Sequence, residues 1–195
     1  GRKMNLISNL LRLSLTNPTE AGAHILALRL NLGAALSAFA VTIIIAVVLM
    51  FALSGFLPTA VLPGFAPMAP VVLVAIMGLG TLGLVGCIWL AARAFGGSGR
   101  FSDGVLVFAW IQILQMGLQI VQTALMVISV TFAGLISIFA TGLLFWILFG
   151  LLNSWLNLGS MWKAALCFFL GVIGLSMGGA FILVSLGFGP QQVVL

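Results

Sequence analysis

The chain has 195 residues, of which 63% are hydrophobic and only 5% are charged. A soluble domain carries about 25% charged residues, so this composition excludes a soluble globular protein, and two cysteines are too few for a disulfide scaffold. The net charge of +5 reflects a shortage of acidic residues, with no basic cluster, which argues against nucleic-acid binding. We therefore predict an all-α, polytopic integral membrane protein whose surroundings are the lipid bilayer.

Residues 1–32 are expected to form a cytoplasmic, amphipathic segment ahead of the membrane domain. Over residues 4–15 the apolar side chains recur with helical spacing and share one arc, with Ser14 as the exception. This pattern predicts a short helix that lies in the cytoplasmic interface of the membrane. Its representative residues are Leu6, Leu10 and Leu13 in the apolar arc and Arg12 on the polar side.

A second short helix is predicted over residues 18–30. Asn17 is suited to be its N-cap, Pro18 its first residue, and Glu20 the acidic member of a capping box. His24 follows on this helix, four residues after Glu20. It is the chain's one histidine, so we interpret it as an interfacial side chain near a carboxylate and predict no metal site.

Residues 33–195 are expected to form a single transmembrane domain. A crossing helix needs about 20 mostly apolar residues, and the uncharged stretch 104–162 is too long for one helix because it would extend about 90 Å at ~1.5 Å per residue. Its weakest helical point is the β-branched and polar stretch 129–134, so two antiparallel helices are predicted there. The five predicted spans are about 33–55, 70–93, 104–128, 133–153 and 162–187.

All seven basic residues fall on one side of the membrane in this five-span arrangement. They are Arg2, Lys3, Arg12, Arg29, Arg93, Arg100 and Lys163. Because basic loops stay in the cytoplasm, we predict a cytoplasmic N-terminus and an external C-terminus. Trp89, Trp155 and Trp162 lie near the predicted cytoplasmic ends, where interfacial aromatic residues are common.

Four glutamines form the strongest internal pattern of the predicted third span. They are Gln112, Gln115, Gln119 and Gln122, and they occupy a wedge of about 80° on the helix. An amide in hydrocarbon is costly unless it is paired, so the wedge is expected to face other helices or water. One interpretation is helix packing through hydrogen bonds to hydroxyls such as Thr42, Thr81, Thr141 or Ser176. The other is a polar translocation path for a substrate or for lipid headgroups.

Glycine is concentrated in the predicted second and fifth spans. The candidates for close helix packing are Gly78, Gly83, Gly86, Gly171, Gly174 and Gly178. Gly174 and Gly178 have the GxxxG spacing that lets two helix backbones approach closely, either within this protein or in a dimer.

The chain offers little material for chemistry. No predicted span has an ionisable residue near its middle, which argues against proton-coupled transport. One histidine and two carboxylates are too few for general acid–base catalysis. The glycine-rich turn 96–99 lacks the Lys-Ser/Thr of a phosphate-binding loop. We predict a protein that is not an enzyme and that has no catalytic residues, no metal and no cofactor.

Three short strings resemble the bacterial branch of the YIP family, the Ypt-interacting membrane proteins. They are Asn-Pro-Thr-Glu-Ala at 17–21, Gly-Gly-Ser-Gly-Arg-Phe at 96–101 and Leu-Asn-Leu-Gly-Ser-Met-Trp-Lys-Ala at 156–164. The resemblance implies a five-span helical bundle in the bacterial inner (cytoplasmic) membrane. Eukaryotic members are linked to Rab-type GTPases, partner membrane proteins and vesicle traffic. The chain has no tyrosine, so it lacks the family's Asp-Leu-Tyr-Gly-Pro string, and Rab-type binding is not expected.

Two functions follow from these observations. The first is a membrane scaffold or accessory subunit that binds other membrane proteins as a homo- or hetero-oligomer. The alternative is a passive transporter or lipid-handling protein that uses the glutamine face of the third span.

Overall fold

The computed structural model describes residues 2–54 and 69–185, and every regular element in these ranges is a helix. The helices are α1 (Arg2–Thr16), α2 (Pro18–Leu26), α3 (Leu32–Leu53), α4 (Pro70–Ala94), α5 (Phe101–Ile128), α6 (Val130–Leu156) and α7 (Met161–Ser185). Within the described ranges, the five helices α3 to α7 are long and apolar enough to cross a membrane. The predicted all-α class is therefore confirmed, and the chain has the architecture of a multi-pass membrane protein.

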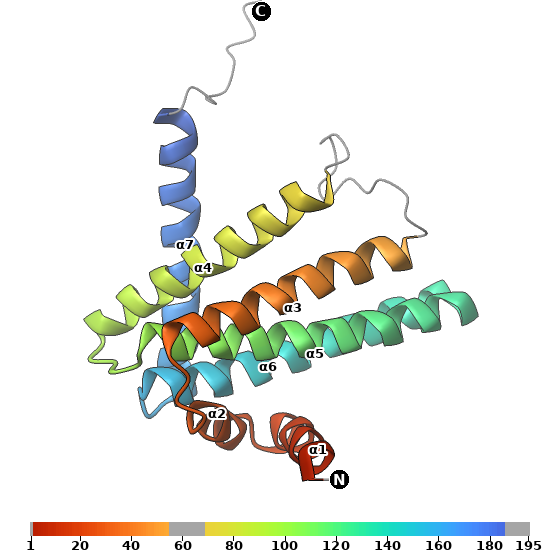
Figure 1. The fold of residues 1–195 in the computed structure, drawn as a ribbon, viewed down its shortest axis with the longest axis horizontal. Helices are drawn as coiled ribbons and strands as arrows, with labels where there is room; N and C mark the ends of the chain where they lie inside the picture. Colours follow the sequence, from red (N-terminus) through yellow and green to blue (C-terminus); the bar gives the residue numbers. More distant parts are fainter. Residues whose placement is uncertain (1, 55–68, 186–195) are drawn as a thin grey trace, which may run out of the picture.

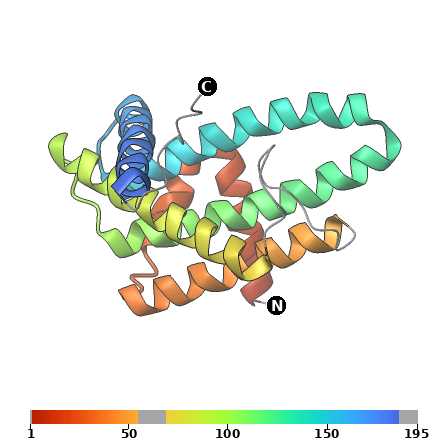
Figure 2. The same cartoon turned by 90° about the horizontal axis from the view of Figure 1, so that it is seen from above.

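The long uncharged stretch is divided at a single residue. Ser129 has an extended backbone, with φ −161° and ψ 121°, between the end of α5 and the start of α6. Its hydroxyl accepts a hydrogen bond from the backbone N–H of Phe132 at 3.3 Å, which caps α6. The prediction of two helices is thus confirmed, and α5 and α6 form the antiparallel hairpin that Figure 2 shows.

The five long helices converge at one end and diverge at the other. We call the first the closed end, where α4 and α6 finish and α3, α5 and α7 begin. Figure 1 shows α3, α5 and α6 running together while α7 rises steeply away from them. The packing follows this shape: Val105, Leu152 and Cys167 near the closed end are fully buried, whereas Val127 is 86% exposed at the far end of the hairpin. The far halves of the helices therefore present apolar side chains that the other described helices do not cover.

The start of α2 has the predicted N-cap and first-position proline, but the predicted capping box is not completed. The Asn17 side chain accepts a hydrogen bond from the Glu20 N–H, and Pro18 occupies the first helical position. The Glu20 carboxylate accepts from the Asn17 side-chain amide at 3.1 Å. It does not reach the Asn17 backbone N–H, because that group already donates to the Leu13 carbonyl at 2.7 Å.

The predicted length of this second helix is wrong. It ends at Leu26 instead of near residue 30. Leu28 and Arg29 donate to carbonyls only three residues back, and Arg29 has a φ of 45°. A left-handed residue cannot continue a right-handed helix, so the chain turns there toward α3.

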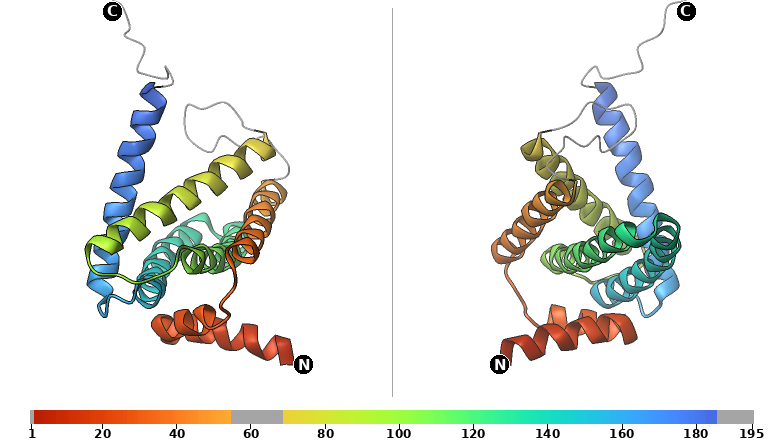
Figure 3. Two further views of the ribbon diagram at one scale, coloured as in Figure 1. Left: turned by 60° about the vertical axis from the view of Figure 1, so that its left-hand side comes forward. Right: turned by 90° about the vertical axis from the view of Figure 1, so that its right-hand side faces the viewer.

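The helices α1 and α2 lie together beside the closed end, below the long helices in both views of Figure 3. The helix α2 packs against α6 at two glycines, because Gly22 faces Ser154 and Gly150 faces Pro18. A side chain at Gly22 would come within 2.6 Å of the Ser154 Cβ. The N-terminal segment is therefore packed onto the helical domain, and the fit depends on positions without a side chain.

Candidate functional site

The loop between α4 and α5 is fixed to the closed end by two tryptophans. The Trp89 indole N–H donates to the Gly99 carbonyl at 2.8 Å, and the Trp155 indole N–H donates to the Arg100 carbonyl at 2.7 Å. The Ser98 backbone N–H also donates to the Leu156 carbonyl at 3.2 Å. These hydrogen bonds pair backbone N–H and C=O groups that would otherwise have to bond with water.

The Trp155 ring fills a space that two glycines leave open. A Cβ on Gly99 or on Gly104 would collide with Trp155, which is 2% exposed. The interpretation of Trp155 as an interfacial aromatic is therefore wrong, since its ring is buried against other parts of the protein and its indole N–H donates to the Arg100 carbonyl. Trp162, by contrast, is 79% exposed.

Arg93 and Trp89 form a further contact at this end. The Arg93 guanidinium lies 4.4 Å from the centre of the Trp89 ring, within the range of a cation–π interaction. A basic side chain on the last turn of α4 also complements the helix dipole. The guanidinium lies over the face of the ring, whereas the indole N–H donates to the loop from the ring edge, so two separate contacts hold Trp89.

The three strings that carry the family resemblance meet around the last turns of α6. Pro18, from the first string, lies against Gly150 of α6. Ser98, from the second string, bonds to Leu156, which opens the third string. These segments are far apart in the sequence, so their meeting is a product of the fold.

The four glutamines of α5 differ in burial. Gln112, Gln119 and Gln122 are half-buried, and Gln115 is exposed. Among the residues that the structure describes, none of the four side-chain amides forms a hydrogen bond. Three of the four hydroxyls that sequence reasoning offered as partners donate within their own helices: Thr42 to Phe39, Thr141 to Ser137 and Ser176 to Val172. The fourth, Thr81, forms no side-chain hydrogen bond with a described residue. The side-chain amides of these four glutamines, the glutamine face of α5, therefore remain available to bond with groups outside the described chain.

The glycines selected for close packing contribute unequally. A Cβ on Gly171 would collide with Ile88, and one on Gly83 would lie 3.0 Å from Leu175, so α4 and α7 cross at these two positions. Gly174 and Gly86 lie near Cys87 and Phe101 at ordinary contact distance. An added Cβ on Gly78 or Gly178 would meet no atom within 4 Å among the described residues.

The apolar side chains of α1 point in two directions. Leu10 is buried and Leu13 half-buried against the protein, while Ile7, Leu11 and Leu15 form an exposed row. Arg12 is exposed, and the side chain of Leu6 lies outside the described ones. The exception in the apolar arc, Ser14, is fully buried and accepts a hydrogen bond from the Trp110 indole at 3.0 Å.

An apolar cavity of about 460 Å³ lies between α3 and α4. Phe39 and Ile43 line it from α3, and Val74 and Gly78 line it from α4. The lining carries no ionisable group, so the cavity is suited to hydrocarbon.

The titratable residues are dispersed. Among the described residues no group of three or more His, Cys, Asp and Glu could hold a metal ion. His24 is exposed on α2, and Asp103 lies in the first turn of α5, a position that favours a carboxylate.

Sequence reasoning missed two long-range contacts, namely Trp155 with the glycine-rich loop and Ser14 with Trp110. The glycine cluster at 96–99 and the serine inside an apolar arc are visible in the sequence, but neither identifies its tryptophan partner, because Trp155 is 55 residues from Arg100 and Trp110 is 96 residues from Ser14. Comparisons of the chain with models of known families, with curated proteins and with solved structures give no match. The arrangement at the closed end and on α5 is therefore interpreted from its own geometry.

Proposed function

We propose that the protein is a non-enzymatic membrane scaffold or accessory subunit that binds other membrane proteins through the glutamine face of α5. The observation that carries this proposal is the state of Gln115: it is exposed on a crossing helix, and its amide has no hydrogen-bond partner among the described residues. An unpaired amide in hydrocarbon is costly. A polar side chain on a helix of another protein would satisfy it, with about 0.6 kcal/mol per bond on average.

Further features support a binding role. The closed end is well packed, while the far halves of the helices expose large apolar side chains such as Val127 and Phe139. The crossing helices α3 to α7 contain no Asp, Glu, Lys or Arg in their central turns, which leaves no ionisable relay for coupled transport.

The proposal includes a membrane and an orientation. The protein lies in the bacterial inner membrane with its N-terminus in the cytoplasm and its C-terminus outside. Arg29, Arg93, Arg100 and Lys163 lie beside the closed end, at the starts of α3, α5 and α7 and the end of α4, and positive charge favours the cytoplasmic side. Membership of the YIP family is also a proposal, supported by the three strings at 17–21, 96–101 and 156–164.

Site-specific photo-crosslinking tests the binding role. A photoreactive residue at Gln115 in native membranes should crosslink to a protein and give a species larger than the 20.4 kDa chain. Ile113 is the matched control, because it is also exposed, lies at a similar depth and points about 160° away on the helix. The same probe at Ile113 should react with lipid alone.

The alternative function, passive transport or lipid handling, uses the same four glutamines. Reconstitution of the purified protein in liposomes distinguishes this function from the binding role. If probes at residues 115 and 113 both react with lipid alone, and the reconstituted protein moves solute or lipid in a manner that Gln115→Leu with Gln119→Leu abolishes, then the binding role is wrong.

A further inference from the structure

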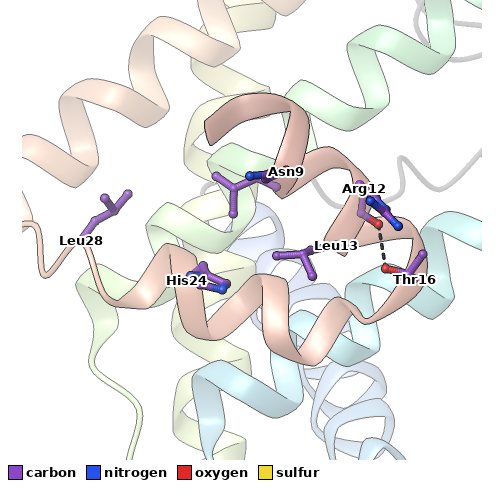
Figure 4. A pocket seen from close by; sticks show the side chains of 7 residues that line it. Asn9, Arg12, Leu13, Thr16, His24 and Leu28 are labelled. Carbon is purple, nitrogen blue, oxygen red and sulfur yellow. Dashed lines mark hydrogen bonds between the residues drawn. The ribbon is translucent and has the colours of Figure 1, made fainter. Parts of the chain in front are cut away.

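A cavity of about 470 Å³ lies between α1 and α2, and Figure 4 shows its lining. Its lining residues are Asn9, Leu10, Arg12, Leu13, Thr16, His24 and Leu28. In Figure 4 the side chains of α1 lie on one side of the cavity and His24 of α2 on the other. The volume falls in the range of ~300–1,000 Å³ that is typical of small-molecule sites.

The polar groups of this cavity include several hydrogen-bond donors, and its one charged side chain, Arg12, is positive. Arg12 contributes a guanidinium, His24 a ring N–H and Asn9 a side-chain amide. None of these three side chains forms a hydrogen bond with another described residue. The Thr16 hydroxyl donates to the Arg12 carbonyl at 2.9 Å. The cavity thus has several donors available for an anionic ligand.

No carboxylate lines the cavity to compete for the guanidinium. The chain has two acidic residues, Glu20 and Asp103. The Glu20 carboxylate accepts from the Asn17 side chain at the start of α2, and Asp103 lies in the first turn of α5. The charge of Arg12 is therefore available to a ligand.

The surroundings indicate where that ligand comes from. Leu10, Leu13 and Leu28 give the cavity an apolar side. On the neighbouring surface of α1, Ile7, Leu11 and Leu15 are 53%, 39% and 53% exposed, and their spacing of four residues places them in one row. An exposed apolar row on a short helix is typical of insertion at the boundary between headgroups and acyl chains.

We propose that this cavity binds the phosphate of an anionic phospholipid headgroup. Arg12 donates its planar pair of N–H groups to two phosphate oxygens, and Asn9 and His24 donate to the remaining ones. The leucines contact the glycerol and the first methylenes of the acyl chains. The same donors suit a free phosphate ester, so the experiment has to separate the two sources. This site is distinct from the glutamine face and does not depend on the scaffold role.

Native mass spectrometry of the full chain, released from nanodiscs, tests the proposal. The discs contain phosphatidylcholine with a minority of phosphatidylglycerol. The wild-type chain should retain phosphatidylglycerol in preference to phosphatidylcholine. Arg12→Gln should lower that retention about tenfold, since a charged hydrogen-bond pair is lost, and Arg12→Lys should restore part of it.

Lys163→Gln is the matched control, because it removes one exposed positive charge at the closed end but outside the cavity. This control variant should keep most of the preference for phosphatidylglycerol over phosphatidylcholine. Leu28→Glu is a second cavity variant at a side chain that is 53% exposed, where a substitution is tolerated by the fold. The added carboxylate should abolish the preference for phosphatidylglycerol, because its negative charge next to Arg12 competes with the phosphate.

Competition with glycerol 1-phosphate or inorganic phosphate distinguishes a lipid ligand from a free phosphate ester. If either displaces phosphatidylglycerol from the wild-type chain, the cavity recognises the phosphate alone; if neither does, recognition requires the lipid. Two results overturn the proposal. The first is a wild-type chain without preference for phosphatidylglycerol. The second is an equal loss in Arg12→Gln and Lys163→Gln, which would indicate general surface attraction.

Discussion

Trp155 joins the end of α6 to residues 99–104, and its hydrogen-bond partner Arg100 lies 55 residues earlier in the chain. Its indole bonds to the Arg100 carbonyl, its ring lies against Gly99 and Gly104, and it is 2% exposed. Trp155→Phe would remove the indole N–H and leave the part-buried Arg100 carbonyl without this donor, which costs about 1–3 kcal/mol. We expect a loss of stability of that size, measured by unfolding of the purified protein in mixed micelles.

Trp162→Phe is the control for that measurement. Trp162 is 79% exposed and lies only seven residues further along the chain. Its substitution should change the stability by less than about 0.5 kcal/mol. Equal effects of the two variants would mean that the bond from Trp155 contributes nothing beyond the bulk of an aromatic ring.

Single residues also show where the sequence is informative. Asn17, Pro18 and Glu20 could be assigned to a helix start because a cap depends on neighbours within four residues. The serine at position 14 was recognisable as an exception, but its partner Trp110 is 96 residues away, and no local pattern identifies such a pair. Local rules therefore predict where helices are capped and interrupted, whereas the hydrogen-bond partners of buried polar groups depend on the fold.

At the scale of elements, α2 docks on α6 through glycines. A Cβ on Gly150 would collide with Pro18 at the start of α2. Gly150→Val overpacks this contact, at a cost of about 1–3 kcal/mol, and should partly detach the N-terminal segment. We expect proteolysis after Arg29 to accelerate about tenfold, since about 1.4 kcal/mol corresponds to that factor.

Gly142 provides a control on the same helix. A Cβ there would meet no described atom within 4 Å, so Gly142→Val has a similar effect on helix propensity without the collision. Its rate of proteolysis should match that of the wild type. Detachment in Gly142→Val would place the cause in α6 itself and not in its contact with α2.

The crossing of α4 and α7 can be tested with a disulfide. A Cβ on Gly174 would lie 3.9 Å from the Cβ of the native Cys87, within the ~3.5–4.5 Å that a disulfide requires. Gly174→Cys should therefore form an intramolecular disulfide with Cys87 on mild oxidation, identified by mass spectrometry of the linked peptides. Gly178→Cys should form none, because a Cβ at that position would meet no described atom of another helix within 4 Å.

The elements themselves were largely predictable, and their contacts were not. The five spans depend on hydrophobic length, which is a local property, and the division near 129–134 depends on local propensity. The GxxxG pair at 174 and 178 is also local, yet α7 approaches α4 most closely at Gly171, against Ile88. A glycine permits an approach, but the partner helix and the crossing point decide where that approach occurs.

For the whole molecule, burial is concentrated at the closed end. Leu151, Leu152 and Leu156 are fully buried there, whereas Met177 and Phe181 toward the end of α7 are 70% and 75% exposed. Composition predicted a membrane protein, but it carries no information on how the helices diverge. Stability thus depends on the closed end, and the far halves of the helices are left to contact lipid or other proteins.

The orientation of the whole molecule follows from its charge distribution. All seven Lys and Arg precede α3, lie between the last turn of α4 and the start of α5, or lie in the first turn of α7. The turn between α5 and α6 at the far end has none. Basic residues are retained in the cytoplasm, so the closed end should be cytoplasmic and the α5–α6 turn external. Two positions are exposed and can therefore be labelled to show which side of the membrane each end faces: Ser98 at the closed end and Thr131 at the turn.

Each position is changed to cysteine in a chain that carries Cys87→Ala and Cys167→Ala. A membrane-impermeant maleimide applied to intact cells should label Thr131→Cys at once. It should label Ser98→Cys only after the cells are permeabilised, because the closed end faces the cytoplasm. A third cysteine at Gln191 should label like the one at position 131 if the C-terminus is external. Labelling of position 98 but not 131 in intact cells would reverse the orientation, and it would also place the cavity between α1 and α2 at the outer leaflet.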